Sequence, residues 1–283
     1  MIDEDLVRAV RDRTAILFVG AGVSMNLGLP DFGGLVDKIA KELGYDPEIF
    51  KLFAGNSELA EFYLVEDRPL GTLRSELDRT WHSNEIDIAD SRVHRLIVEL
   101  DFPLIYTTNF DRWIELAYDH WNKKYVKVAR VSDVKRIVPD TTQIVKLHGD
   151  FEDDDSLVLT EASYFDRLDL ESPLDIKLRA DTLGRTILFV GYSLSDINIR
   201  LFLYNLSKLW RASEDPTGRP RSFIVVHQPN PVQEAIMRSR GVTPISLDTA
   251  KPGEALAAFL GELLEAAFHR TLEDPTVKEP EGL

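Results

Sequence analysis

Short apolar runs alternate along this chain with longer segments of helical spacing. The apolar runs cover residues 16–19, 103–107, 144–147, 157–159, 187–190, 223–226 and 244–247. Most are followed by a segment whose apolar residues recur at helical intervals, at residues 111–121, 195–210, 232–239 and 253–269. Buried strands that alternate with helices are typical of a parallel sheet covered on both faces. We therefore predict an α/β protein with a Rossmann-like sheet.

The pattern changes between residues 32 and 100. Helical spacing is found at residues 35–43, 57–62, 70–81 and 91–100, and no segment reads clearly as a strand. We predict one α/β domain over residues 1–270, with a helical module inserted at about residues 34–100. The last residues, 271–283, are polar and Pro-rich, which predicts a disordered tail.

Composition narrows the class of protein. Hydrophobic residues make up 44% and charged residues 29%, as in an ordinary soluble globular protein. No apolar run reaches the roughly 18 residues of a membrane span, and the N-terminus lacks a signal-peptide core, so we expect a cytoplasmic protein without a membrane partner. The chain has no cysteine, which excludes disulfides, a cysteine-based zinc site and thiol catalysis.

The charge balance is acidic. There are 33 basic and 48 acidic residues, a net charge of −15. Such a surface repels the phosphate backbone of nucleic acids, so we expect no direct tight binding to them. A plainer interpretation is that the acidity serves solubility.

The first candidate for chemistry is the turn after residues 16–19. Gly20, Ala21 and Gly22 follow that apolar run directly, and glycines there let the backbone approach a pyrophosphate. Ser24 could add a hydroxyl donor or cap the next helix. The usual dinucleotide fingerprint has a third glycine where this chain has Met25. The turn alone therefore leaves nucleotide binding and a simple chain reversal both open.

Three further polar segments follow predicted strands, at residues 107–111, 146–150 and 191–196. Asn109 can orient a water or a sugar hydroxyl, because an amide both donates and accepts. His148 can take a proton near neutral pH. Each segment could instead only cap a helix. Since the carboxyl ends of parallel strands share one sheet edge, the four turns together favour a ligand site there.

Other polar residues are less specific. Asp31 and Phe32 lie in a loop that could fold over a ligand, or Asp31 could simply cap the next helix. Histidines outside the predicted sheet edge lie in helical or polar contexts, and we expect them at the surface or in packing. They are His82, His94, His120 and His269.

The ordered set of motifs resembles the sirtuin superfamily over roughly residues 14–227. It consists of GAGVS at 20–24, GLPDF at 28–32, TNFD at 108–111, HG at 148–149 and GYSL at 191–194. The resemblance implies a phosphate-binding turn that does not need the third glycine.

Departures from that family point to one branch of it. Sirtuins that deacylate proteins usually carry a four-cysteine zinc ribbon, which this chain cannot form. Gly33 stands where they have Arg, Thr108 where they have Gln, and His227 where they have an adenosine-binding Asn. The chain thus resembles the zinc-free sirtuin-like domains of bacterial anti-phage systems, and the implied activity is NAD⁺ hydrolysis.

The resemblance also implies roles for single residues. Asn109 and His148 would be catalytic, with Asp111 positioning one of them. NAD is the implied substrate, and no metal is implied. The remaining residues implied to contact NAD are Gly20, Ala21, Gly22 and Ser24 at the pyrophosphate, Asp31 and Phe32 at the nicotinamide half, Thr108 in the catalytic loop, and Gly191 and Ser193 at the adenosine half.

A defence NADase must be controlled, which implies a homo-oligomer or a partner. Single-domain proteins of this type resemble those that work with HerA-type ATPases, whereas short Argonaute systems usually carry a further domain that we do not find here. The helical module is the surface we expect to serve this contact.

Two other functions stay open at this point. One is a zinc-independent deacylase or ADP-ribosyltransferase at the same NAD⁺ site. The other is a subunit that senses NAD⁺ or ADP-ribose without cleaving it, although the presence of both Asn109 and His148 favours an enzyme.

Overall fold

The computed structural model describes residues 2–192, 196–215, 218–228, 230–247 and 249–269. These residues build a parallel sheet in the order β3-β4-β2-β1-β5-β6-β7. Its strands are β1 (Ala15–Val19), β2 (Leu104–Thr107), β3 (Tyr125–Val128), β4 (Thr142–Lys146), β5 (Thr186–Val190), β6 (Ser222–Val226) and β7 (Val242–Ser246). The predicted α/β fold is confirmed. The predicted tail, residues 271–283, lies outside the described residues.

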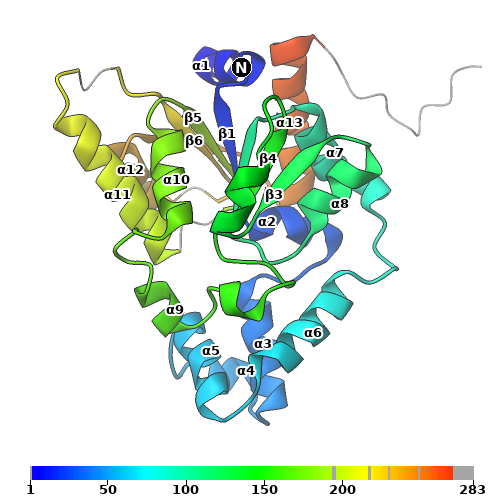
Figure 1. Ribbon diagram of the computed structural model, residues 1–283. Coiled ribbons are helices and arrows are strands. Elements are labelled where there is room, and N and C mark those ends of the chain that lie inside the picture. Colours follow the sequence, from blue (N-terminus) through cyan, green and yellow to red (C-terminus); the bar gives the residue numbers. More distant parts are fainter. Residues whose placement is uncertain (1, 193–195, 216–217, 229, 248, 270–283) are drawn as a thin grey trace, which may run out of the picture.

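The central strand β1 shows why the apolar runs form a sheet buried on both faces. Its residues are all buried, and successive side chains enter opposite hydrophobic clusters. Leu17 and Val19 join the cluster of α1 (Glu4–Arg11), α7 (Arg92–Glu99), α8 (Trp113–His120) and α13 (Pro252–Phe268). Ile16 and Phe18 join that of α10 (Pro173–Thr182), α11 (Ile197–Arg211) and α12 (Pro231–Ser239). Figure 1 shows these two helical layers on either side of the sheet.

A third group of helices has a hydrophobic core of its own. It comprises α3 (Phe32–Glu42), α4 (Pro47–Phe50), α5 (Asn56–Val65) and α6 (Leu70–Trp81). Figure 1 shows it beyond α2 (Ala21–Ser24), toward the ends at which the strands finish. The helix α7 also lies within the predicted insertion, but it packs on the sheet. The division into a domain and an inserted module stays a prediction.

Short elements complete the described chain. They are α9 (Glu161–Phe165) and the 3₁₀ turns η1 (Met25–Leu27), η2 (Ile88–Asp90), η3 (Val131–Arg136) and η4 (Asp154–Ser156). Within the residues described, no helix is long and apolar enough to cross a membrane.

One strand assigned from the sequence was wrong, and one strand of the structure was missed. Residues 157–159 form no strand. They lie between η4 and α9, and their buried side chains Val158 and Leu159 explain the apolar run. The strand β3 escaped prediction, because it is an edge strand and three of its four residues are only partly buried. An apolar run reports burial, which strands and packed loops share.

Candidate active site

The four polar turns lie side by side at one edge of the sheet. Their strands are neighbours in the order β4-β2-β1-β5. In register, Val19 at the end of β1 lies beside Thr107 of β2 and Val190 of β5, and Thr107 lies beside Lys146 of β4. The turns therefore begin at the same level, which is where ligands bind in open parallel sheets.

The turns after β1 and β5 touch through their backbones. The Gly22 N–H donates to the Gly191 carbonyl at 2.9 Å. A Cβ on Gly22 would lie 2.8 Å from Gly191 Cα, and one on Gly191 would lie 2.5 Å from Val23 N. Gly191 also has a φ of +60°. Glycine is therefore required at both positions by the close approach of the two turns.

The third glycine of the dinucleotide fingerprint would stand at position 25. Here Met25 occupies it, directly after α2 and at the start of η1. Its side chain is 50% exposed. The third glycine of that fingerprint permits close packing of helix against strand. Because Met25 faces solvent, this turn has no such requirement.

A chain of hydrogen bonds connects the first turn to the loop after β2. The Asn109 side-chain nitrogen Nδ2 donates to Gly20 O at 3.2 Å and to Ser24 Oγ at 3.1 Å. Ser24 Oγ donates in turn to Asp111 Oδ2 at 2.8 Å. The other oxygen of Asp111 accepts the Trp113 N–H at the start of α8. With both Nδ2 hydrogens used, the oxygen Oδ1 of Asn109 can accept a hydrogen bond from a ligand.

His148 follows β4 and is almost fully buried. Its Nε2 lies 3.1 Å from Asp196 Oδ2, and its ring meets that of Tyr164 edge-on at 5.3 Å. Asp196 also accepts the Tyr192 hydroxyl at 3.2 Å and caps α11 through the Asn198 N–H at 2.8 Å. When the carboxylate holds the proton on Nε2, the basic nitrogen of His148 is Nδ1.

The charge on Asp196 is stabilised by these partners. Burial by itself would raise the pKa of this carboxyl. The charge and hydrogen bond of His148, together with the capped amides of α11, outweigh burial and lower the pKa instead. Asp196 therefore remains an anionic partner for His148 at neutral pH.

The other predicted contact residues have more ordinary positions. Asp31 is exposed and caps α3, accepting the Gly34 N–H at 2.9 Å, while Phe32 packs on the core of the third helical group. Thr108 is partly buried in the loop after β2. Ala21 begins α2 directly after Gly20. Ser193 lies outside the described residues.

The remaining histidines do not join this group. His94 is buried in α7 and hydrogen-bonded to Ser91 Oγ at 2.7 Å, and burial lowers its pKa to about 4. His82 pairs with Asp78, and His120 is exposed at the end of α8. His227 follows β6, half-buried, at the same edge of the sheet as the polar turns.

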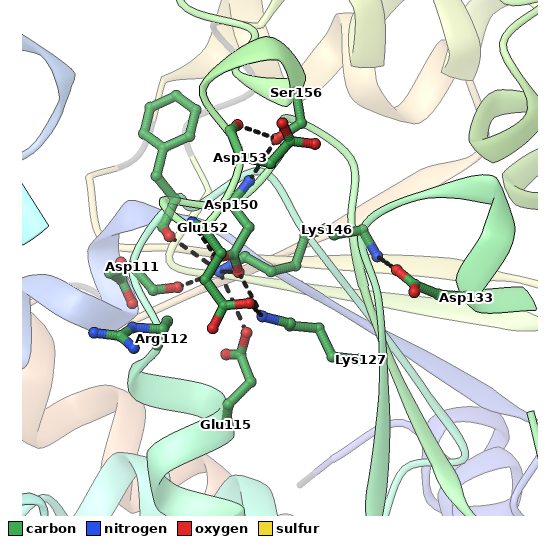
Figure 2. A network of polar contacts seen from close by, with 12 residues as sticks. Asp111, Arg112, Glu115, Lys127, Asp133, Lys146, Asp150, Glu152, Asp153 and Ser156 are labelled. Atoms are coloured by element: carbon green, nitrogen blue, oxygen red, sulfur yellow. Dashed lines mark hydrogen bonds and ion pairs between the residues drawn. The ribbon is translucent and has the colours of Figure 1, made fainter. Parts of the chain in front are cut away.

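Several functional candidates were missed from the sequence. In the sequence, Asp196 and Tyr192 are only parts of a polar turn. In the structure, Asp196 lies next to His148, and Tyr192 donates a hydrogen bond to Asp196. Lys146 is fully buried and pairs with Asp150 and Glu115 (Figure 2). A charged residue inside an apolar strand was the signal that could have singled out Lys146.

Among the residues that the structure describes, no group of three or more His, Cys, Asp or Glu side chains could hold a metal ion.

Comparison with known proteins finds curated relatives that match most of this chain. The NAD(+) hydrolase ThsA of Bacillus cereus (strain MSX-D12) is 29% identical over 233 residues, covering 81% of this chain and 46% of ThsA. ThsA of Enterococcus faecium is 28% identical, with 74% and 43% covered. The defense-associated sirtuin 2 of Bacillus subtilis is 27% identical, with 82% and 23% covered. The chain thus spans less than half the length of these curated relatives.

A solved structure supports the fold. The crystal structure of a Sir2 homolog–NAD complex matches with a TM-score of 0.50 at 14% identity, covering 94% of this chain and 96% of that one. Residues 103–245, half of the chain, match the family described as the SIR2-like domain. These residues contain Asn109, His148 and Gly191. The chain belongs to the SIR2-like domain family.

Proposed function

We propose that this protein hydrolyses NAD⁺ to nicotinamide and ADP-ribose. The observation that carries the proposal is the placing of Asn109 and the His148–Asp196 pair at one sheet edge, next to the glycine turn after β1. The names of the ThsA relatives support the same reaction. The name of the defense-associated relative supports a role in anti-phage defence, where the enzyme would deplete NAD⁺.

The reaction suits these side chains. The bond from the ribose C1′ to the nicotinamide nitrogen breaks, and its electron pair leaves with nicotinamide, which departs uncharged. The ribose passes through an oxocarbenium-like state, as in glycoside hydrolysis. Asn109 Oδ1 would accept a hydrogen bond from a ribose hydroxyl or the attacking water. His148 would take the proton of that water as its oxygen bonds to C1′.

The glycine turn would hold the pyrophosphate. Its backbone N–H groups lie at the carboxyl end of β1, where anions bind in this kind of sheet. The Gly22 N–H is bonded to Gly191 in this structure, so a phosphate oxygen would replace that carbonyl as acceptor. Ser24, between Asn109 and Asp111, would couple the pyrophosphate turn to the catalytic loop.

The test is NAD⁺ turnover by the purified protein, alone and mixed with a candidate HerA-type ATPase. Asn109→Ala and His148→Ala are compared with the wild type, and His120→Ala serves as a control because that histidine is exposed. Release of nicotinamide and ADP-ribose, lost in both site variants and kept in the control, supports the proposal. Turnover that requires an acylated peptide or acceptor protein indicates a transferase or deacylase. Bound NAD⁺ without turnover indicates a sensor.

We further propose that the protein acts in the cytoplasm as a homo-oligomer with a HerA-type ATPase, and without direct tight nucleic-acid binding. A cysteine-free, strongly acidic chain supports the compartment and the lack of nucleic-acid binding. Exposed apolar side chains at the end of the third helical group support a contact surface; they are Tyr45, Ile49, Leu52 and Phe53. Leu52 is 82% exposed. A protein that is monomeric in native mass spectrometry and fully active in the turnover assay contradicts this proposal.

A further inference from the structure

Lys146, the last residue of β4, has no exposed side-chain surface. Lysine is almost never fully buried unless it is paired, because removing its charge from water costs several kcal/mol. Burial alone would lower the pKa of this ammonium, but the charges of Glu115, Asp150 and Asp111 outweigh burial and raise it. The side chain is therefore a buried cation at neutral pH.

The ammonium of Lys146 makes two hydrogen bonds and one close ion pair. Nζ donates to Phe110 O at 3.0 Å and to Asp111 O at 2.6 Å, and lies 2.9 Å from Asp150 Oδ2 (Figure 2). Glu115 is farther away, at 3.3 Å, and neither of its carboxylate oxygens has a hydrogen-bond partner. Burial raises the pKa of Glu115, against the opposing charge of Lys146. Glu115 thus balances charge, while the two carbonyls accept the hydrogen bonds and Asp150 forms the closer ion pair.

The acceptors belong to the two segments that carry the proposed catalytic side chains. Two are backbone carbonyls of the loop that begins with Asn109, and the third is a carboxylate two residues after His148. The buried ammonium of Lys146 therefore contacts both the loop after β2 and the turn after β4. Lys127 of the edge strand β3 lies 3.4 Å from Asp150 and places a second positive charge beside that carboxylate.

We infer that Lys146 is a positioning residue for the reaction at this edge, holding the Asn109 loop and the His148 turn at a fixed separation. The inference rests on the proposed function. A well-packed apolar side chain often stabilises a core as well as a buried ion pair does, so stability alone gives no reason for a charge here. Two donors aimed at the carbonyls of a catalytic loop supply a different benefit, which is preorganisation of that loop.

The inference predicts a particular pattern of kinetic change. The pyrophosphate turn follows β1, whereas the hydrogen bonds of Lys146 go to the loop after β2. Loss of the ammonium should lower kcat by about 100-fold, as expected for a misplaced catalytic group. The KM for NAD⁺ should stay within about threefold, because ground-state binding is retained.

The obvious variant, Lys146→Met, leaves Glu115 without its cation and could unfold the protein. The informative variant is therefore Lys146→Met combined with Glu115→Gln, which removes one charge of each sign and leaves Asp150 with Lys127. Glu115→Gln alone is the matched control, since it keeps the two hydrogen bonds of Lys146 and its ion pair with Asp150. Each protein is measured for kcat, KM, thermal melting and hydrogen exchange of the amides at 108–112, with those of β5 as internal reference.

We expect the control to match the wild type, and the double variant to lose kcat while its loop amides exchange faster and its β5 amides are unchanged. Unchanged kcat and exchange in the double variant would overturn the inference. So would equal losses in the control, or faster exchange in the loop and β5 alike, since these indicate a general loss of stability. If the wild type shows no turnover but loop exchange responds as expected, the proposed function fails and the anchoring by Lys146 stands.

Discussion

Asp196 offers the sharpest test of how the proposed base is held. Its carboxylate pairs with His148 at 3.1 Å, accepts the Tyr192 hydroxyl and caps α11. In Asp196→Asn the cap should survive, because Asn and Asp are equally good at this position. The charge opposite His148 is lost. The substitution therefore removes the anionic partner of the His148 ring and leaves the cap of α11 in place.

The magnitude follows from the type of bond that is lost. A hydrogen bond to a charged, buried group contributes about 1.5–3 kcal/mol. If that interaction holds His148 in its reactive orientation, kcat/KM should fall by about 10- to 150-fold. The free energy of unfolding at pH 7 should fall by a similar amount, since Asp196 is largely buried.

The pH dependence gives an independent check. The pKa of Asp196 is lowered in the folded protein from an ordinary value of 3.8. The unfolded chain therefore binds the proton more readily, and the stability due to the carboxylate is present above about pH 4 and lost as the pH falls through the lower, folded pKa. The difference in unfolding free energy between wild type and Asp196→Asn should shrink over that acidic range.

The assay is NAD⁺ turnover together with chemical denaturation at pH 7 and at acidic pH. Asp46→Asn is the control, because Asp46 caps α4 through two N–H groups, at 3.0 and 3.1 Å, and is exposed. Wild-type turnover and stability in Asp196→Asn at pH 7 would refute the reasoning. An equal loss in Asp46→Asn would also refute it, because the effect would then come from capping.

Two further predictions concern the glycine turn and the buried histidine. Gly22→Ala should cost about 1–3 kcal/mol of stability and weaken NAD⁺ binding, because the new methyl group would lie 2.8 Å from Gly191 Cα. Thermal melting measures the stability and calorimetric titration the affinity for NAD⁺. An unchanged affinity contradicts the role of the turn. His94 has its pKa lowered to about 4 by burial, from an ordinary value of 6.5. The unfolded state therefore binds the extra proton first, and stability should fall by up to about 3 kcal/mol as the pH drops from 6.5 toward 4. Denaturation of His94→Gln across that range should show a smaller slope, and an equal slope contradicts the assignment.

The sequence alone predicts a parallel sheet and the sheet edge at which its polar turns gather. Apolar runs at residues 16–19 and 187–190 are dictated by burial on both faces, and the structure places both at the centre of the sheet. Turns that follow parallel strands must share one edge, so the sequence alone predicts Asn109 and His148 at the same edge. The burial of a strand is a local property and the shared edge is a topological one, so both can be derived from residue periodicity and motif spacing.

The side chains that complete the candidate site are brought together by contacts between elements distant in sequence. The contact of Asp196 with His148 joins the start of α11 to the end of β4, and no spacing in the chain specifies it. The contacts of Lys146 depend on how the loop after β2 folds back toward β4. Residues 157–159 look like a strand but pack as a loop, because burial alone does not fix backbone pairing. Hydrophobic pattern determines what is buried, whereas the partners of buried charges are set by the packing of elements distant in sequence.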